Sequence, residues 1–115
     1  MVRIILGSKT DIDVCEPIKA TLEEFEVKYD FHVSSAHRRP ENTANLAKNA
    51  ETEGFKVIIA CAGMAAHLPG VIASHTILPV IGVPVQSGAL MGVDALYSIA
   101  QMPPGVPVAS VAING

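Results

Sequence analysis

Two serines, a histidine and two arginines stand together in the stretch FHVSSAHRRPEN, residues 31–42. The stretch opens with strand-like alternation and Pro40 suits the first turn of a helix, so the polar residues follow a strand and precede a helix. Ser35 and Arg38 can hold a phosphate, because arginine offers charge-assisted donors in a fixed fork. Histidine transfers protons near neutral pH, so His37 is the candidate acid–base residue, with a plain surface position as the alternative.

A second candidate segment is GSKTD, residues 7–11. Gly7 permits close backbone approach, and Ser8 and Thr10 carry hydroxyls beside a helix start, where free N–H groups attract a phosphate. A carboxylate would repel that phosphate, so Asp11 is expected to accept hydrogen bonds from sugar hydroxyls. Capping of the helix by Thr10 or Asp11 is the structural alternative. The segment has neither Walker A spacing nor the glycines of a dinucleotide loop.

The third segment, AGMAAHLPG at residues 62–70, is rich in small residues. The backbone N–H groups around Gly63 can surround a small planar group or a carboxylate, although tight packing of a helix on a strand explains the same residues. His67 can line that pocket or cap a helix. No metal is expected, because His37 and His67 have no Cys, Asp or Glu cluster at a familiar spacing. A serine hydrolase is not expected either, since the Gly-x-Ser-x-Gly elbow is absent.

Composition narrows the class of protein further. The 115 residues, half of them apolar, suit one domain with a real core. A net charge of −3 without a basic run argues against nucleic acid or an anionic membrane as partner. Cys15 and Cys61 are expected to be reduced, buried thiols, and with neither a leader pattern nor a long apolar run the protein is expected to be cytoplasmic. Abundant small residues favour an oligomer.

Strands and helices are expected to alternate along the whole chain. Strands are predicted at 2–6, 27–33, 56–63, 79–85 and 106–113, and helices at 11–25, 40–53, within 64–75 and at 92–102. This order predicts an α/β fold: a three-layer, doubly wound, flavodoxin-like parallel sheet of about five strands. Ligands of such sheets bind beyond the carboxyl ends of the strands, where all three polar segments lie.

Five segments, in order, resemble the PurE family of purine biosynthesis: ILGSKTD, SSAHRRP, AGMAAHLPG, LPVIGVPV and ALMGVDALYSIAQMPPGVPVA. Together they cover essentially the whole chain. Arginine rather than lysine after the histidine resembles the class I, bacterial-type mutases. The resemblance implies a 5-(carboxyamino)imidazole ribonucleotide mutase, which moves a carboxylate from the exocyclic nitrogen to C4 through release and recapture of carbon dioxide, without metal or organic cofactor.

The resemblance also implies roles for individual residues. His37 corresponds to the acid–base residue, and the loop from Gly63 to His67 surrounds the reacting carboxylate. The residues that match Ser8, Asp11 and Arg38 bind the ribonucleotide in the family. Together with the neighbouring residues of the three segments, the expected substrate-binding residues are Ser8, Thr10, Asp11, Ser35, Ala36, Arg38, Gly63 and His67. The family further implies a homo-octamer with active sites near the subunit contacts.

Two features depart from the family pattern. Arg39 stands where the family usually has threonine, which is expected to alter affinity rather than abolish function. Residues 1–115 are expected to form a single PurE-like α/β domain without the C-terminal helical extension of the family. Two alternatives stay open: direct carboxylation of aminoimidazole ribonucleotide by carbon dioxide, and a non-catalytic nucleotide-binding module of flavodoxin-like shape.

Overall fold

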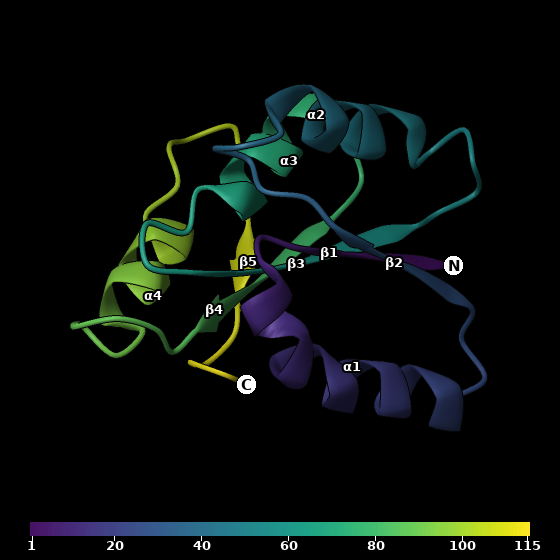
Figure 1. Cartoon of the computed structure of the whole chain (residues 1–115). Coiled ribbons are helices and arrows are strands. Elements are labelled where there is room, and N and C mark those ends of the chain that lie inside the picture. Colours follow the sequence, from purple (N-terminus) through teal and green to yellow (C-terminus); the bar gives the residue numbers. More distant parts are fainter.

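A single parallel sheet with helices on both faces makes up the computed structural model, which describes all residues from Met1 to Gly115 (Figure 1). The strands lie in the order β2-β1-β3-β4-β5. They are β1 (Val2–Leu6), β2 (Tyr29–Val33), β3 (Val57–Gly63), β4 (Val80–Val85) and β5 (Ala109–Ser110). The helices are α1 (Ile12–Glu24), α2 (Pro40–Asn49), α3 (Leu68–His75) and α4 (Val93–Ala100), and a 3₁₀ turn, η1 (Lys9–Asp11), precedes α1. The predicted three-layer α/β fold is confirmed.

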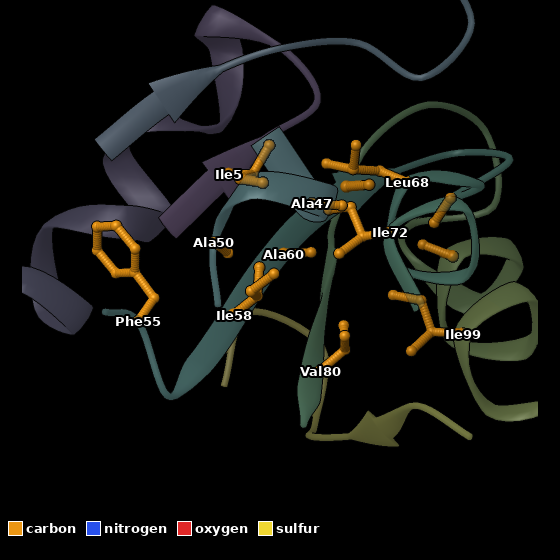
Figure 2. Close-up of a cluster of buried hydrophobic side chains, with 13 residues drawn as sticks. Ile5, Ala47, Ala50, Phe55, Ile58, Ala60, Leu68, Ile72, Val80 and Ile99 are labelled. Atoms are coloured by element: carbon orange, nitrogen blue, oxygen red, sulfur yellow. The ribbon is translucent and has the colours of Figure 1, made fainter. Parts of the chain in front are cut away.

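Two apolar layers hold the helices against the sheet. Helices α2, α3 and α4 contribute to one layer, in which Ile58 and Ala60 of β3 pack near Ile72 of α3 (Figure 2). The other layer gathers around α1 and contains Ile4 and Leu6 of β1. Successive residues of a strand point to opposite faces, so β1 is covered on both sides, which explains its nearly unbroken apolar run.

The strand order reverses between β1 and β3. The chain moves outward from β1 to β2 and then returns to the other side of β1. Leu6 lies opposite both Val33 and Cys61, so the loops after β1, β2 and β3 begin at about the same level of the sheet. A reversal of this kind opens a crevice at the carboxyl edge, where the three polar segments are attached.

The strand predicted at 27–33 begins two residues later because α1 ends in a Schellman motif. Glu26 has a φ of 57° and its N–H donates to Glu23 O at 3.0 Å. The Val27 N–H donates to Leu22 O at 2.8 Å. This pair of bonds around a left-handed residue satisfies the last carbonyls of a helix. Val27 therefore belongs to the helix cap and not to the strand.

The last predicted strand, over 106–113, is wrong in length, because only Ala109–Ser110 pair regularly with β4. Further along, the Asn114 N–H donates to Pro84 O at 2.8 Å. Proline has no N–H to donate in return, so the ladder between β4 and the last segment cannot continue regularly.

Helix ends follow the predicted signals with one difference. The second helix was expected to reach 53, but α2 ends at Asn49, and turns carry the chain to Gly54. Gly54 has a φ of 92°, which glycine adopts without a steric penalty, so it does stop the helical segment. Apart from this helix and the last strand, the predicted bounds lie within two residues of those observed, and α3 falls inside the predicted range 64–75. None of the helices has the length and apolar character needed to cross a bilayer.

Both cysteines are free and buried, as predicted. Burial raises the pKa of the Cys61 thiol to about 12, and burial also raises the pKa of the Cys15 thiol. Thiols of this kind carry little thiolate at neutral pH and pack as small apolar side chains.

Candidate active site

One cavity of about 380 Å³ opens at the carboxyl edge of the sheet. All nine residues predicted for the site line it: Ser8, Thr10, Asp11, Ser35, Ala36, His37, Arg38, Gly63 and His67. They come from the loops after β1, β2 and β3. Residues far apart in the sequence therefore meet where the topology reverses.

The loop after β1 uses most of its backbone donors internally. The Ser8 N–H donates to Asp11 Oδ2 at 3.1 Å, and Ser8 Oγ accepts the Thr10 N–H at 3.3 Å. The Asp11 N–H donates to Ser8 O at 3.1 Å. Ser8 and Asp11 thus form a capping box for η1. The N-cap of η1 is therefore Ser8 and not Thr10 or Asp11, although Asp11 takes part in the box through its carboxylate. These bonds leave few free N–H groups to receive a phosphate.

Asp11 is a buried carboxylate, with 4% of its surface exposed. Burial raises the pKa of this carboxyl above its ordinary value, while the hydrogen bond from the Ser8 N–H opposes the change. Only Oδ2 accepts a hydrogen bond within the chain. No fully buried side-chain oxygen lacks a partner, so Oδ1 keeps access to the cavity and can accept a bond from a ligand.

Buried hydroxyls tie the loop after β2 to α2. Ser34 Oγ and Thr43 Oγ1 lie 2.7 Å apart, and Asn42 Nδ2 donates to Ser34 Oγ at 2.9 Å. The Arg39 N–H donates to Ser35 O at 2.8 Å and closes the turn that carries residues 36–38. The position of His37 is therefore set by α2 as well as by β2.

The same turn presents groups suited to an anion. Ser35 Oγ accepts the Arg38 N–H at 3.2 Å, which leaves its hydroxyl hydrogen free to donate. The Arg38 guanidinium is exposed and forms none of the ion pairs of the chain. The N–H groups of Ala36 and His37 donate to no acceptor in the chain. Arg39, by contrast, does not line the cavity.

The imidazole rings of His37 and His67 lie next to one another in the wall of the cavity. Their ring centroids are 5.2 Å apart and the rings are tilted by 41°. Both side chains are exposed, and no group of three His, Cys, Asp or Glu side chains converges here or elsewhere in the chain. Two accessible imidazoles at this separation can exchange protons with a ligand between or beside them.

The loop after β3 contributes backbone donors. The Ala66 N–H donates to Met64 O at 2.8 Å and the His67 N–H to Ala65 O at 2.7 Å. The N–H groups of Met64 and Ala65 donate to no acceptor in the chain. Two adjacent free N–H groups beside a cavity are suited to a carboxylate.

Ser87 is the polar lining residue that sequence reasoning did not name. It lies two residues after the end of β4, and a Cβ on Gly63 would lie only 3.0 Å from Ser87 Cβ. Glycine at 63 therefore allows the ends of β3 and β4 to approach closely. The signal available in the sequence was the polar QSG segment directly after the fourth strand.

A second cavity of about 620 Å³ adjoins the first. His37, Ala65 and His67 line both, so the two imidazoles lie at their junction. The second cavity extends between α3 and the segment after α4, where Val71 and Met102 make it more apolar.

Known proteins resemble this chain over nearly its whole length. The family model described as AIR carboxylase matches residues 1–115. A protein of Pyrococcus abyssi and one of Thermotoga maritima, both named N5-carboxyaminoimidazole ribonucleotide mutase, are 56% and 57% identical to 99% and 98% of this chain. The chain spans 66% of the length of each.

A solved structure shows the same fold. The crystal structure of Treponema denticola PurE aligns with a TM-score of 0.88 at 30% sequence identity, over 98% of this chain and 72% of that one. With a family match over every residue and relatives more than half identical, the chain belongs to the AIR carboxylase family, and the resemblance to PurE is confirmed.

Proposed function

We propose that this chain carries the active site of a class I 5-(carboxyamino)imidazole ribonucleotide mutase, an isomerase of de novo purine biosynthesis. The product is 4-carboxy-5-aminoimidazole ribonucleotide. The observation that carries the proposal is the single cavity that joins an unpaired arginine, a buried carboxylate and a histidine pair. The names of the two relatives point to the same reaction, for proteins of which this chain spans about two thirds.

The substrate phosphate fits best beside the turn after β2. Arg38 supplies the charge, the Ser35 hydroxyl a donor, and Ala36 and His37 free N–H groups. The loop after β1 is less suitable for the phosphate, because its N–H groups are already used and Asp11 is anionic when ionised. Asp11 is better suited to accept hydrogen bonds from the ribose hydroxyls.

The carboxylate fits the loop after β3. The free N–H groups of Met64 and Ala65 can donate to it, and small side chains leave room for the planar group. The imidazole ring of the substrate would then lie between this loop and His37. This placement brings both the exocyclic nitrogen and C4 near one histidine.

The reaction then needs one proton-carrying group. Protonated His37 gives its proton to the exocyclic nitrogen as the N–C bond breaks and carbon dioxide forms. The electron-rich C4 of aminoimidazole ribonucleotide attacks carbon dioxide, and the new C–C bond restores the carboxylate. The C4 proton returns to His37, so the enzyme ends in its starting state. Holding carbon dioxide close to C4 supplies much of the rate enhancement.

The deciding experiment is turnover of 5-(carboxyamino)imidazole ribonucleotide by the purified chain, without ATP, added metal or bicarbonate. We expect the C4-carboxylate to form faster than in an enzyme-free control. If product forms only when bicarbonate and aminoimidazole ribonucleotide are supplied, the direct carboxylase is correct. Without product in either assay, the proposal fails for this chain.

His37→Asn separates an enzyme from a nucleotide-binding module. Asparagine can still form hydrogen bonds but cannot carry the proton, so we expect turnover to fall about 10²- to 10⁴-fold while substrate binding by calorimetry is retained. Equal turnover in the variant and the unmodified chain would support the non-catalytic module instead.

We further propose that the protein acts in the cytoplasm, needs no cofactor, and assembles as a homo-oligomer, an octamer in the family. Leu90, Met91 and Tyr97, which are exposed around α4, would be covered by such assembly. Sedimentation equilibrium should give a mass several times 12.0 kDa, and a mass of one chain at micromolar concentration would contradict assembly.

A further inference from the structure

Met64 has an unusual backbone conformation for its residue type. Its φ is 52°, in the left-handed region, where a side chain is strained and glycine is preferred. Of the four non-glycine residues with positive φ, Met64 alone lines the cavity, and the others are Glu26, Met91 and Asn114. Residues of this kind persist only where the surrounding structure holds them, and they cluster at active sites and ligand clamps.

The side chain of Met64 lies at the mouth of the cavity. It lines the cavity, yet 56% of its surface is exposed, so it has the cavity on one side and solvent on the other. A Cβ placed on Gly88 would lie 3.5 Å from both Cγ and Cε of Met64. The methionine thus reaches from the loop after β3 to the loop after β4.

Hydrogen bonds and charges in the cavity cannot hold carbon dioxide strongly. The proposed reaction breaks the substrate into aminoimidazole ribonucleotide and carbon dioxide, and the latter carries no charge for the Ala65 N–H or Arg38 to bind strongly. Retention of carbon dioxide must therefore depend on the side chains that wall the cavity and on a side chain that covers its opening. Methionine is apolar and adaptable, which suits a side chain that must admit the substrate and then cover it.

We propose that Met64 is a specificity-determining residue that retains carbon dioxide in the cavity between its release and its recapture. The inference rests on the proposed mutase function. If closure fails, the N–C bond still breaks, His37 still protonates the nitrogen, and the products are aminoimidazole ribonucleotide and free carbon dioxide. His37 then regains its proton from water, so the leak is a balanced decarboxylation.

The test measures both products from 5-(carboxyamino)imidazole ribonucleotide by chromatography, after subtraction of the enzyme-free rate. Met64→Gly removes the side chain and relieves the left-handed strain, so the fold should be retained. We expect the ratio of aminoimidazole ribonucleotide to C4-carboxylate to rise several-fold in the variant. The rate of total substrate consumption should stay within about one order of magnitude of that of the unmodified chain, because the proton-transfer group is untouched.

Two further variants sharpen the test. Met64→Leu keeps apolar bulk and should give a product ratio close to that of the unmodified chain. Glu26→Gly is the matched control: Glu26 is also exposed, has a φ of 57° and does not line the cavity, so the ratio should not change.

Three results would overturn the inference: an unchanged ratio in Met64→Gly, leakage in Met64→Leu equal to that in Met64→Gly, or leakage in Glu26→Gly equal to that in Met64→Gly. Failure of the proposed function looks different, because the unmodified chain would then consume no substrate above the enzyme-free rate.

Discussion

Opposite charges occupy different loops of the candidate site. Arg38, after β2, is an exposed cation without an ionic partner, whereas Asp11, after β1, is a buried carboxylate within a capping box. A ligand with a phosphate at one end and neutral hydroxyls near the other matches this separation. One oxygen of Asp11 closes the capping box, and the other is left without a partner in the chain.

Arg38→Ala should raise the substrate KM about 10- to 100-fold and leave kcat nearly unchanged, because a charge-assisted phosphate contact acts in both the ground and the transition state. Steady-state kinetics measures both constants. Arg39→Ala is the matched control, since Arg39 is exposed but does not line the cavity, and its KM should change much less. A fall in kcat with an unchanged KM would contradict the role assigned to Arg38.

Asp11→Asn should stabilise the fold at neutral pH and weaken substrate binding. Burial raises the pKa of Asp11, so the folded state binds this proton more tightly than the unfolded state, and the ionised carboxylate costs stability above the raised pKa. That cost disappears as the pH falls toward about 3.9, the ordinary value for aspartate. Urea unfolding should therefore show an advantage of the variant at pH 7 that shrinks toward pH 4. A constant difference would contradict this account.

At the scale of elements, α2 is attached to the sheet at both ends. Near its start, the buried Thr43 contacts Ser34 of the loop after β2. Near its end, Arg3 of β1, 4% exposed, donates through Nη1 to Leu46 O at 2.8 Å. Arg3 also forms ion pairs with Asp30, at 2.9 Å, and with Glu53. The helix therefore holds the His37 turn in a fixed relation to the sheet.

The Asp30 carboxyl in this network responds to two opposing effects. Burial alone would raise its pKa, but hydrogen bonds from Arg3 and His32 outweigh burial and hold the pKa below its usual value. A carboxyl with a lowered folded pKa stabilises the fold above its unfolded pKa and loses that effect as the pH falls through the lowered value. The network should thus remain intact at the neutral pH of the assays proposed above.

Thr43→Val should destabilise the protein by about 1–3 kcal/mol and lower turnover, because valine has the shape of threonine but leaves buried Ser34 with one fewer partner. Thr43→Ser keeps the hydroxyl and is the control. Denaturant unfolding and steady-state kinetics should both place the serine variant nearer to the unmodified chain. Two variants of equal activity would mean that this hydroxyl does not position the His37 turn.

At the scale of the whole molecule, the carboxyl edge of the sheet depends on how closely β4 approaches its neighbours. Gly82 is the tightest point: a Cβ there would lie 2.5 Å from Ile99 Cγ2 of α4 and 3.1 Å from Val108 Cγ1. Only a residue without a side chain lets α4 and the last segment pack on this strand.

Gly82→Ala should destabilise the fold by about 1–3 kcal/mol, because overpacking forces α4 or β5 to move. Gly70→Ala is the control, since its Cβ would meet only the end of the flexible Met102 side chain, at 3.2 Å. Urea unfolding monitored by circular dichroism gives both free energies. Equal stability of the two variants would show that the packing around β4 can relax more freely than the distances suggest.

The sequence by itself determined the fold class and most of the polar residues that line the cavity. Each strand appeared as an apolar run or an alternation of apolar and polar residues, and each helix as apolar residues three or four positions apart. The two patterns differ because a strand and a helix turn their side chains toward the core at different intervals. Parallel strands bring their carboxyl ends to one edge, so the polar segments after the first three strands had to meet. The nine predicted lining residues follow from that rule together with the PurE resemblance.

Only the tertiary structure decided which polar groups remain free to bind a ligand. The capping box uses the donors after β1, whereas Arg38 and the N–H groups of Met64 and Ala65 stay unpaired. Ser87 joins the cavity through the close approach of β3 and β4, and Pro84 shortens the last strand. These outcomes depend on distances between segments remote in sequence, and local periodicity does not encode such distances.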